Sequence, residues 1–337
     1  MPPFTAEALN RATLARQLLL ERARLPVARA MERLCAVQAQ SPLEAYTGMW
    51  SRLDGFKKEQ LTRALERRRV VRATLFRVTL HFVSATNHAA FAAVNHRRWR
   101  EDLLREGVPV DELVARVDRL AENGTFTYAD VSGLTPELGE KQFRVRCLTP
   151  LVHVPPSGTW GHSRVRLTTA RRWLGEPAPS QPVAAALVVR RYLGAFGPAT
   201  RRDLLAFSRL RVADIGPGLE LLEGQLRRFV DEEGRELLDL PRAPRPPADT
   251  PAPVRLLPRW DALLLSHADR SRVLPPEYRA AVITGGWVHA TFLVDGVVAG
   301  LWKPKGERIE LEPFAPLPLR IRRELEDEAA RLARFLA

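Results

Sequence analysis

Twice along this chain, the spacing of apolar residues changes from a helical period to the alternation of a β-strand. The helices predicted before the first change cover residues 9–20, 26–37, 42–53 and 58–68. From Arg77 to Phe82, polar and apolar residues then alternate, with Thr79 and His81 beside Arg77 on the polar face. This switch limits the first part of the chain to helices followed by a β-hairpin.

The same order returns between residues 190 and 240. One helix is predicted to end at Ala195. Thr200 and Asp203 form a capping-box pattern at the start of the next helix, and residues 218–226 are predicted to form a third helix. Residues 227–230 and 236–240 flank an Asp-Glu-Glu-Gly turn, which predicts a hairpin. Helices followed by a hairpin are the order of elements in a winged helix. We therefore predict tandem winged helix-turn-helix units.

The last part of the chain follows a proline-rich segment. Residues 241–253 contain six prolines and few apolar residues, which is typical of a semi-rigid linker. A hairpin with an Asp295-Gly296 turn and a final helix over 319–336 follow. We predict a helix-rich α+β protein with three parts. They are a first winged-helix region at 1–165, a second unit at 166–245, and a C-terminal winged-helix or β-hairpin-rich module at 246–337.

The charge of the chain indicates its partner. Its 52 lysines and arginines exceed its 39 aspartates and glutamates, for a formal net charge of +13. Arginine supplies nearly all of this positive charge, and its planar fork suits phosphate groups. We expect double-stranded DNA as the partner. The alternative is the codon bias of a GC-rich genome, which also enriches arginine, alanine, leucine and proline.

Other compartments and cofactors are not indicated. Cys35 and Cys147 are too few for a disulfide scaffold and lack the spacing of metal ligands. Neither a signal peptide nor an apolar run of membrane-spanning length is visible. We expect a soluble, cytoplasmic, nucleoid-associated monomer without a metal or a cofactor.

The tripeptide Gln38-Ala39-Gln40 lies where two predicted helices meet. Ser41 and Pro42 predict a new helix start, with Ser41 as N-cap and Glu44 closing a capping box. In an extended joint, side chains two residues apart point the same way. Gln38 and Gln40 would then present two amides to one substrate. The alternative is that they only tie the joint together.

Several stretches resemble the azinomycin-resistance type of bacterial DNA glycosylases, a family built from tandem winged-helix units. The stretches are Leu34–Pro42, Arg72–His81, Ala195–Thr200 with Asp203, and Leu257–Asp261 with Asp269–Arg272. The resemblance implies removal of alkylated purines, in some members bulky adducts or interstrand crosslinks. It implies that Gln38 and Gln40 are catalytic and that Thr79 and His81 line the same cleft. Many family members are described only as winged-helix DNA-binding proteins.

The residues favour a particular substrate chemistry. Cleavage of an N-glycosidic bond builds positive charge on the sugar, and ordinary glycosidases use two carboxylates. Here the proposed site shows no carboxylate. Two glutamine amides can still position and polarise a water, which suffices for a leaving group that is already activated. A purine alkylated at N7 or N3 is such a group, since it leaves as a neutral base. His81 would contact the DNA backbone or order that water; the alternative for Thr79 and His81 is a solvated strand face.

Arginine clusters predict the DNA contacts. Each cluster by itself is also compatible with an ordinary solvated face, so they are treated as a set. The predicted DNA-binding residues are Arg67, Arg68, Arg69, Arg72, Arg77, Arg97, Arg98, Trp99, Arg201 and Arg202. Arg201 and Arg202 stand at a helix start, where backbone N–H groups also favour phosphate.

Two other functions are compatible with parts of the sequence. Winged-helix modules are mostly transcriptional regulators, although no dimerisation zipper or effector domain is visible. A metallo-nuclease would need clustered ligands, and Asp261, His267 and Asp269 match no familiar metal motif. Asp269 and Arg270 are predicted to form a structural ion pair. The expected function is a monofunctional DNA glycosylase, with a non-catalytic regulator as the alternative.

Overall fold

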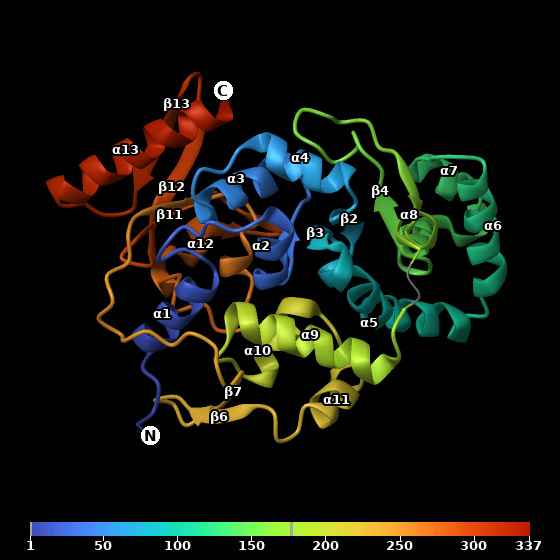
Figure 1. Ribbon diagram of the computed structural model, residues 1–337, viewed down its shortest axis with the longest axis horizontal. Coiled ribbons are helices and arrows are strands. Elements are labelled where there is room, and N and C mark those ends of the chain that lie inside the picture. The colour runs from blue at the N-terminus through green and yellow to red at the C-terminus, as the bar shows by residue number, and fades with distance from the viewer. Residues whose placement is uncertain (1, 176–177) are drawn as a thin grey trace.

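The computed structural model describes residues 2–175 and 178–337 of the chain, and it has an α+β fold (Figure 1). The N-terminal helices are α1 (Ala6–Arg16), α2 (Val27–Arg33), α3 (Pro42–Arg52) and α4 (Lys58–Glu66). An antiparallel sheet with the strand order β1-β3-β2-β4-β5 has its first strand between α2 and α3 and its other strands after α4. Its strands are β1 (Val37–Gln38), β2 (Val70–Thr74), β3 (Leu80–Ser84), β4 (Leu151–His153) and β5 (Leu167–Thr169).

Strand β3 of the β2–β3 hairpin begins later than the predicted strand, and it lacks the solvated face that was the alternative for Thr79 and His81. Phe76–Val78 forms a 3₁₀ turn, in which Arg77 and Val78 have φ values of +57° and +56°. The strand β3 begins only at Leu80, and it is covered on both faces, so that even His81 is 1% exposed. Phe76 packs against Phe91 of the following helix at 5.2 Å between ring centroids. The hairpin is therefore an interior element and does not project as a wing.

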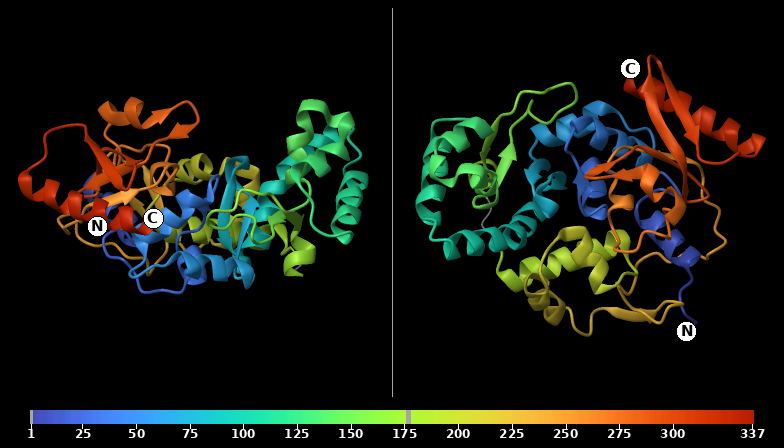
Figure 2. Two further views of the ribbon diagram at one scale, coloured as in Figure 1. Left: turned by 90° about the horizontal axis from the view of Figure 1, so that it is seen from above. Right: turned by 180° about the vertical axis from the view of Figure 1, so that it is seen from behind.

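Helices α5 (Ala85–Arg105), α6 (Val110–Glu122) and α7 (Tyr128–Gly133), and the 3₁₀ segment η2 (Pro136–Cys147), follow the hairpin. Most of them share a separate apolar core with Leu151 and Leu167 of the sheet. Helices α6 and α7 lie at the end of the molecule opposite the C-terminal helix (Figures 1 and 2). Cys35 and Cys147 are both buried and unpaired.

The second helix–hairpin series is present between residues 181 and 239. Its elements, after the short helix α8 (Ala170–Leu174), are α9 (Gln181–Phe196), α10 (Arg201–Ser208), α11 (Val212–Leu221), β6 (Arg227–Val230) and β7 (Glu236–Asp239). The predicted capping box is confirmed, since the Asp203 backbone N–H donates to Thr200 Oγ1 at 3.1 Å and the Thr200 N–H donates to Asp203 at 2.9 Å. The predicted hairpin is confirmed as well, because β6 and β7 pair antiparallel.

The C-terminal part contains a sheet with the order β13-β12-β11-β8. Its elements are β8 (Arg255–Leu257), α12 (Arg279–Val282), β9 (Ile283–Thr284), β10 (Trp287–Val288), β11 (Thr291–Val294), β12 (Val297–Lys305), β13 (Arg308–Pro313) and α13 (Leu319–Leu336). The predicted Asp-Gly turn and final helix are confirmed. Gly296 has a φ of +80°, and a Cβ there would lie 2.5 Å from Leu14 of α1, so the turn needs glycine for two reasons.

Buried arginines on α1 and α3 tie the three parts together. Sequence spacing places Arg11 and Arg16 on the polar side of the first helix, yet both are buried. Arg16 makes two hydrogen bonds to Asp239 at 2.6 and 2.9 Å, and both side chains are fully buried. Arg52 pairs in the same way with Asp261 at 2.7 and 2.8 Å. These two pairs therefore connect the N-terminal helices to β7 and to the segment after β8.

The proline-rich segment 241–253 contains neither helix nor strand, as expected of a linker. It is nevertheless fastened to α1. The Arg11 Nε atom donates to the carbonyl of Thr250 at 2.6 Å, and Arg16 Nε donates to the carbonyl of Pro244 at 3.1 Å. The prediction of a semi-rigid spacer is therefore wrong in that the segment packs onto the first helix.

Candidate active site

The joint between α2 and α3 is extended, as predicted, although α2 ends at Arg33 rather than at Val37. Gln38 pairs with His81 across β1 and β3, and the N–H of Ala39 donates to the carbonyl of Leu80 at 2.7 Å. Ala39 packs into a hydrophobic core. Because side chains alternate in an extended segment, Gln38 and Gln40 project from the opposite face to Ala39.

The start of α3 was predicted only in part. Pro42 occupies the first helical position, but Ser41 makes no side-chain capping bond. Glu44 does not close a capping box, because its carboxylate pairs with Arg259 at 2.6 Å and accepts from the Arg259 backbone N–H at 3.0 Å. The buried Glu44 is thereby used to hold the segment after β8 against the glutamine joint.

Gln38 has a defined orientation. Arg77 Nη2 donates to Gln38 Oε1 at 2.7 Å, and because a guanidinium only donates, the amide oxygen of Gln38 must face Arg77. The NH₂ group of Gln38 is left for other partners. Gln40 is exposed, and its amide oxygen lies 3.4 Å from the backbone nitrogen of Leu80. The buried Gln38 is thus fixed, while Gln40 faces solvent.

His81 and Thr79 lie beside Gln38 but not on a solvated face. His81 Nδ1 lies 2.9 Å from the Thr79 carbonyl, which accepts and so places the proton of the neutral ring on Nδ1. Its Nε2 lies 3.4 Å from Arg77 Nη2. Burial and the Arg77 charge lower the pKa of His81 to about 3. Thr79 Oγ1 donates to the Phe76 carbonyl at 3.1 Å. His81 is therefore a neutral, positioned ring at physiological pH.

Arg72, predicted to bind DNA, fixes the backbone of the joint instead. It is buried, and it donates to the carbonyls of Ala39 and Gln40, each at 2.9 Å. Burial lowers the pKa of Arg72 to about 10. Gly158 covers this side chain with a φ of +85°, and a Cβ there would lie 2.9 Å from Arg72 Cδ. The position of Arg72 does not support a contact with DNA, whereas Arg77 is half-buried and contacts Gln38.

A cavity of about 10 Å³ adjoins Gln38, which is about the room that one water needs. Glu44, Arg52 and Asp261 line it beside Gln38. Sequence reasoning expected no carboxylate here, but tertiary packing brings two. Burial raises the pKa of Glu44, which Arg259 partly offsets. In the sequence, only the family-like stretch Leu257–Asp261 indicated this part of the site. Its position next to Gln38 could not be predicted before the fold was known.

An exposed aromatic pair stands beside the same cavity. Trp260, which lines the cavity, packs on Trp287 at 4.9 Å between ring centroids, and Trp287 is 52% exposed. Arg259 lies over the Trp260 ring at 5.3 Å. Sequence reasoning missed both tryptophans as site residues. Trp287 follows Gly285-Gly286 at the tip of the β9–β10 hairpin. This glycine pair was the sequence feature that could have predicted a turn presenting an exposed tryptophan.

The remaining predicted DNA-binding residues differ in their exposure and in whether they form ion pairs. Arg67, Arg68 and Arg69 are exposed just after α4, and Arg68 stacks over Trp173 at 4.0 Å. Arg201 and Arg202 are exposed at the start of α10. On α5, Arg97 pairs with Glu101 at 2.7 Å and Arg98 with Asp102 at 3.5 Å, and Trp99 lies between Arg98 and Arg144. Their roles in DNA binding stay predictions.

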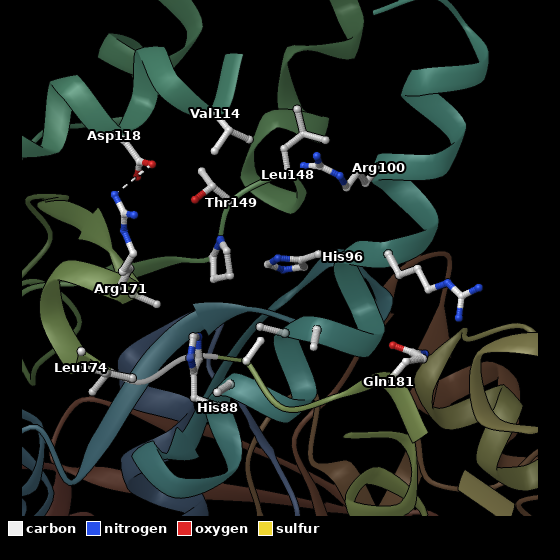
Figure 3. A pocket seen from close by; sticks show the side chains of 18 residues that line it. His88, His96, Arg100, Val114, Asp118, Leu148, Thr149, Arg171, Leu174 and Gln181 are labelled. Carbon is white, nitrogen blue, oxygen red and sulfur yellow. Dashed lines mark hydrogen bonds and ion pairs between the residues drawn. The ribbon is translucent and has the colours of Figure 1, made fainter. Parts of the chain in front are cut away.

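A larger cavity of about 720 Å³ lies between α5, α6 and α8, and Figure 3 shows His88 and His96 pointing into it. Arg97 and Arg100 also line it. None of its lining residues lines the cavity at Gln38. Burial lowers the pKa of His88 to about 3 and that of His96 to about 4. His96 is therefore a neutral buried ring and not part of a basic run.

These buried histidines predict a pH dependence of stability. The pKa values of His81, His88 and His267 are about 3 in the folded protein, against about 6.5 when unfolded. As pH falls below about 6.5, only the unfolded chain takes up these protons, so the free energy of unfolding should fall by up to about 1.4 kcal/mol per pH unit for each histidine. Urea titrations between pH 7 and 4.5, a window above most carboxylate titration, measure this. Equal stability at both ends would contradict it, and the exposed His162 replaced by glutamine is the control.

No metal site is formed by the side chains that the structure describes. Within residues 2–175 and 178–337, no group of three His, Cys, Asp or Glu could hold an ion. Asp261 pairs with Arg52, and His267 Nε2 lies 3.0 Å from the Phe196 carbonyl. Asp269 pairs with Arg235 at 3.4 Å, so the predicted Asp269–Arg270 pair is wrong. In the same part of the chain, no helix is long and apolar enough to cross a membrane.

The comparisons with known proteins place the chain as a whole in a class. The model of the AlkZ-like family of DNA glycosylases matches residues 31–335, so the chain belongs to this family. An interstrand DNA cross-link repair glycosylase from Streptomyces sahachiroi is 27% identical over 353 residues, covering 95% of this chain and 93% of that protein. The solved structure of S. sahachiroi DNA glycosylase AlkZ has the same fold, with a TM-score of 0.83, 23% identity, and coverage of 99% of this chain and 97% of the other.

Proposed function

We propose that this protein is a DNA glycosylase that hydrolyses the N-glycosidic bond of cationic alkylated purines in duplex DNA. The observation that carries the proposal is the pair of glutamine amides on one face of the extended joint, with Gln38 fixed by Arg77. Family membership supports the reaction class. The cross-link repair activity in the name of the Streptomyces relative supports bulky adducts and interstrand crosslinks as part of the substrate range.

The two amides have complementary tasks in this reaction. The Gln38 oxygen is taken by Arg77, so its NH₂ group is available to donate to a water or to the sugar. The exposed Gln40 amide can accept from that water and face the positive charge that develops on the sugar. Neutral His81 supplies no proton at physiological pH, which restricts the enzyme to bases that leave without protonation. N7- and N3-alkylated purines meet this condition.

The proposed enzyme is monofunctional. A lyase activity needs an amine that forms a Schiff base with the sugar. Among the described residues, no lysine lines the cavity at Gln38. Glu44 and Asp261 are paired with arginines there, and we assign them to positioning the segment 258–262. Hydrolysis by a positioned water is the chemistry that the remaining side chains support.

We infer that the second unit, within residues 166–245, binds the duplex as a winged helix. The second unit has the matching order of three helices and a hairpin, and its α10 begins with exposed Arg201 and Arg202. The buried β2–β3 hairpin cannot act as a wing of the first unit. The exposed Trp287, next to the glutamine site, is suited to stack on a base exposed by the lesion.

Release of 7-methylguanine from a methylated duplex by the purified protein tests the proposed function. A nitrogen-mustard-treated duplex run in parallel tests bulky adducts. Release of free base, with the abasic strand left uncut, supports a monofunctional glycosylase. Tight binding with no release from either duplex would favour the non-catalytic transcriptional regulator, which is the alternative function.

Exposed arginines after α4 should contribute to DNA affinity. Replacing Arg67 and Arg69 together by glutamine should weaken duplex binding and lower the slope of log affinity against log salt by about 1 to 2, because each phosphate contact releases about one counterion. Fluorescence anisotropy between 50 and 300 mM salt measures the slope. Arg320→Gln is the matched control, since Arg320 is exposed on α13 and pairs with Glu324. An unchanged slope would remove Arg67 and Arg69 from the interface.

A further inference from the structure

Arg77 is a half-buried cation without a carboxylate partner among the described residues. Its guanidinium contacts the amide oxygen of Gln38, the Phe207 carbonyl and the His81 ring, all of which are uncharged. The buried Arg16 and Arg52 show the usual arrangement, in which aspartates neutralise the charge. A partly desolvated cation that lacks its anion is stabilised when an anion binds there.

The backbone that carries Arg77 is unusual as well. Arg77 and Val78 both have a left-handed conformation, with φ values of +57° and +56°, and neither is a glycine. This conformation costs roughly 1–2 kcal/mol for each such residue. Strain of this kind is concentrated at functional sites. The turn places the Arg77 guanidinium against Gln38 instead of in solvent.

The charges of two further arginines act on Arg77, and the charge of a third acts on one of those two. Arg209 ends α10, two residues after the Phe207 carbonyl that Arg77 contacts, and it is exposed. Arg270 is half-buried, with its Nε atom enclosed and unpaired. Arg279 is exposed at the start of α12. Burial, Arg209 and Arg270 together lower the pKa of Arg77 to about 10. Burial, Arg279 and Arg209 lower that of Arg270.

The cluster carries no counter-charge of its own. Among the residues that the structure describes, no aspartate or glutamate forms an ion pair with any of these four arginines. Two members of the cluster, Arg209 and Arg279, are exposed, and the other two, Arg77 and Arg270, are half-buried. Guanidinium forks bind phosphate oxygens with good geometry.

We propose that Arg77, Arg209 and Arg270 form a subsite for one phosphodiester of the DNA backbone next to the lesion. The proposal rests on the proposed function, because it uses the same Gln38 site. A bound phosphate would neutralise Arg77 while Arg77 holds the Gln38 oxygen. Phosphate binding would thereby hold the catalytic amide in register with the damaged nucleotide.

Single methylphosphonate replacements in the damaged strand test the subsite. Each of the six phosphates around one 7-methylguanine is made neutral in turn, and base release is measured under single-turnover conditions. At one position, the wild-type rate should fall by about tenfold or more. On the normal duplex, Arg209→Gln should lower the rate of base release by the same factor. On the sensitive methylphosphonate duplex, Arg209→Gln should cause no further decrease in the rate. Arg320→Gln is the control, since Arg320 is exposed on α13 and pairs with Glu324.

The possible outcomes separate the subsite from the proposed function. If wild-type protein releases base and no methylphosphonate affects the rate, the subsite is wrong and the function stands. Additive effects of Arg209→Gln and methylphosphonate at every position would also overturn it. A third outcome is that inorganic phosphate, at constant ionic strength, inhibits the wild-type protein but not Arg209→Gln, while the methylphosphonate effects stay additive with that substitution. This outcome would show that the cluster binds a free anion instead of the DNA backbone. If no base is released at all, the proposed function fails. The subsite is then tested by measuring the affinity of the protein for each methylphosphonate duplex.

Discussion

Gln40→Ala is expected to lower the rate of base release by about 100-fold, the usual scale for losing one positioned catalytic group. Gln40 is exposed and its side chain contacts only the Leu80 backbone nitrogen, so the fold should not change. Duplex affinity should stay within about twofold, because a single neutral amide contributes little to phosphate binding. Single-turnover release of 7-methylguanine and anisotropy on the same duplex measure the two quantities.

Gln38 allows a sharper version of this experiment. Gln38→Glu keeps an oxygen for Arg77 and adds a favourable charge, but it removes the NH₂ donor. We expect stability near or above wild type and a loss of activity similar to that of Gln40→Ala. Gln225→Ala is the matched control, since Gln225 is an exposed glutamine whose side-chain oxygen contacts only Arg190. Wild-type rates for Gln40→Ala and Gln38→Glu would show that the glutamines only tie the joint together.

Asp239→Ala is expected to lower the free energy of unfolding by about 3–5 kcal/mol, the usual cost of leaving a buried charge unpaired. Asp239 accepts two hydrogen bonds from Arg16 and one from Arg245, and the Arg16 side chain is fully buried. After the substitution, the Arg16 charge retains only backbone carbonyl partners. Urea unfolding followed by circular dichroism measures the change.

The double variant Arg16→Met, Asp239→Ala separates the pair from its packing. Removing both charges should recover part of the loss, because no uncompensated cation then remains in the interior. Glu324→Ala, which breaks an exposed pair on α13, should leave stability close to wild type. A double variant less stable than Asp239→Ala would show that Arg16 contributes through its packing more than through its charge.

Local sequence patterns determined several elements of this protein correctly. The Thr200–Asp203 capping box, the Asp295-Gly296 turn and the final helix each depend on residues within a few positions of one another. The extended joint at Gln38 and Gln40 belongs to the same group, because Pro42 restricts the residue before it. The paired amides could therefore be proposed as a site before the fold was known.

Tertiary structure alone decided which charged side chains are buried. Arg16 and His81 occupy positions that helical spacing or alternation assigns to a polar face, and Arg72 was predicted to bind DNA, yet each lies in the interior with a polar partner. The partners of Arg16 and Arg72 come from distant segments, such as Asp239 for Arg16. Helical period and alternation report only which side chains share a face, not what covers that face. The carboxylates beside Gln38 and the arginine cluster around Arg77 were therefore visible only once distant segments had packed together.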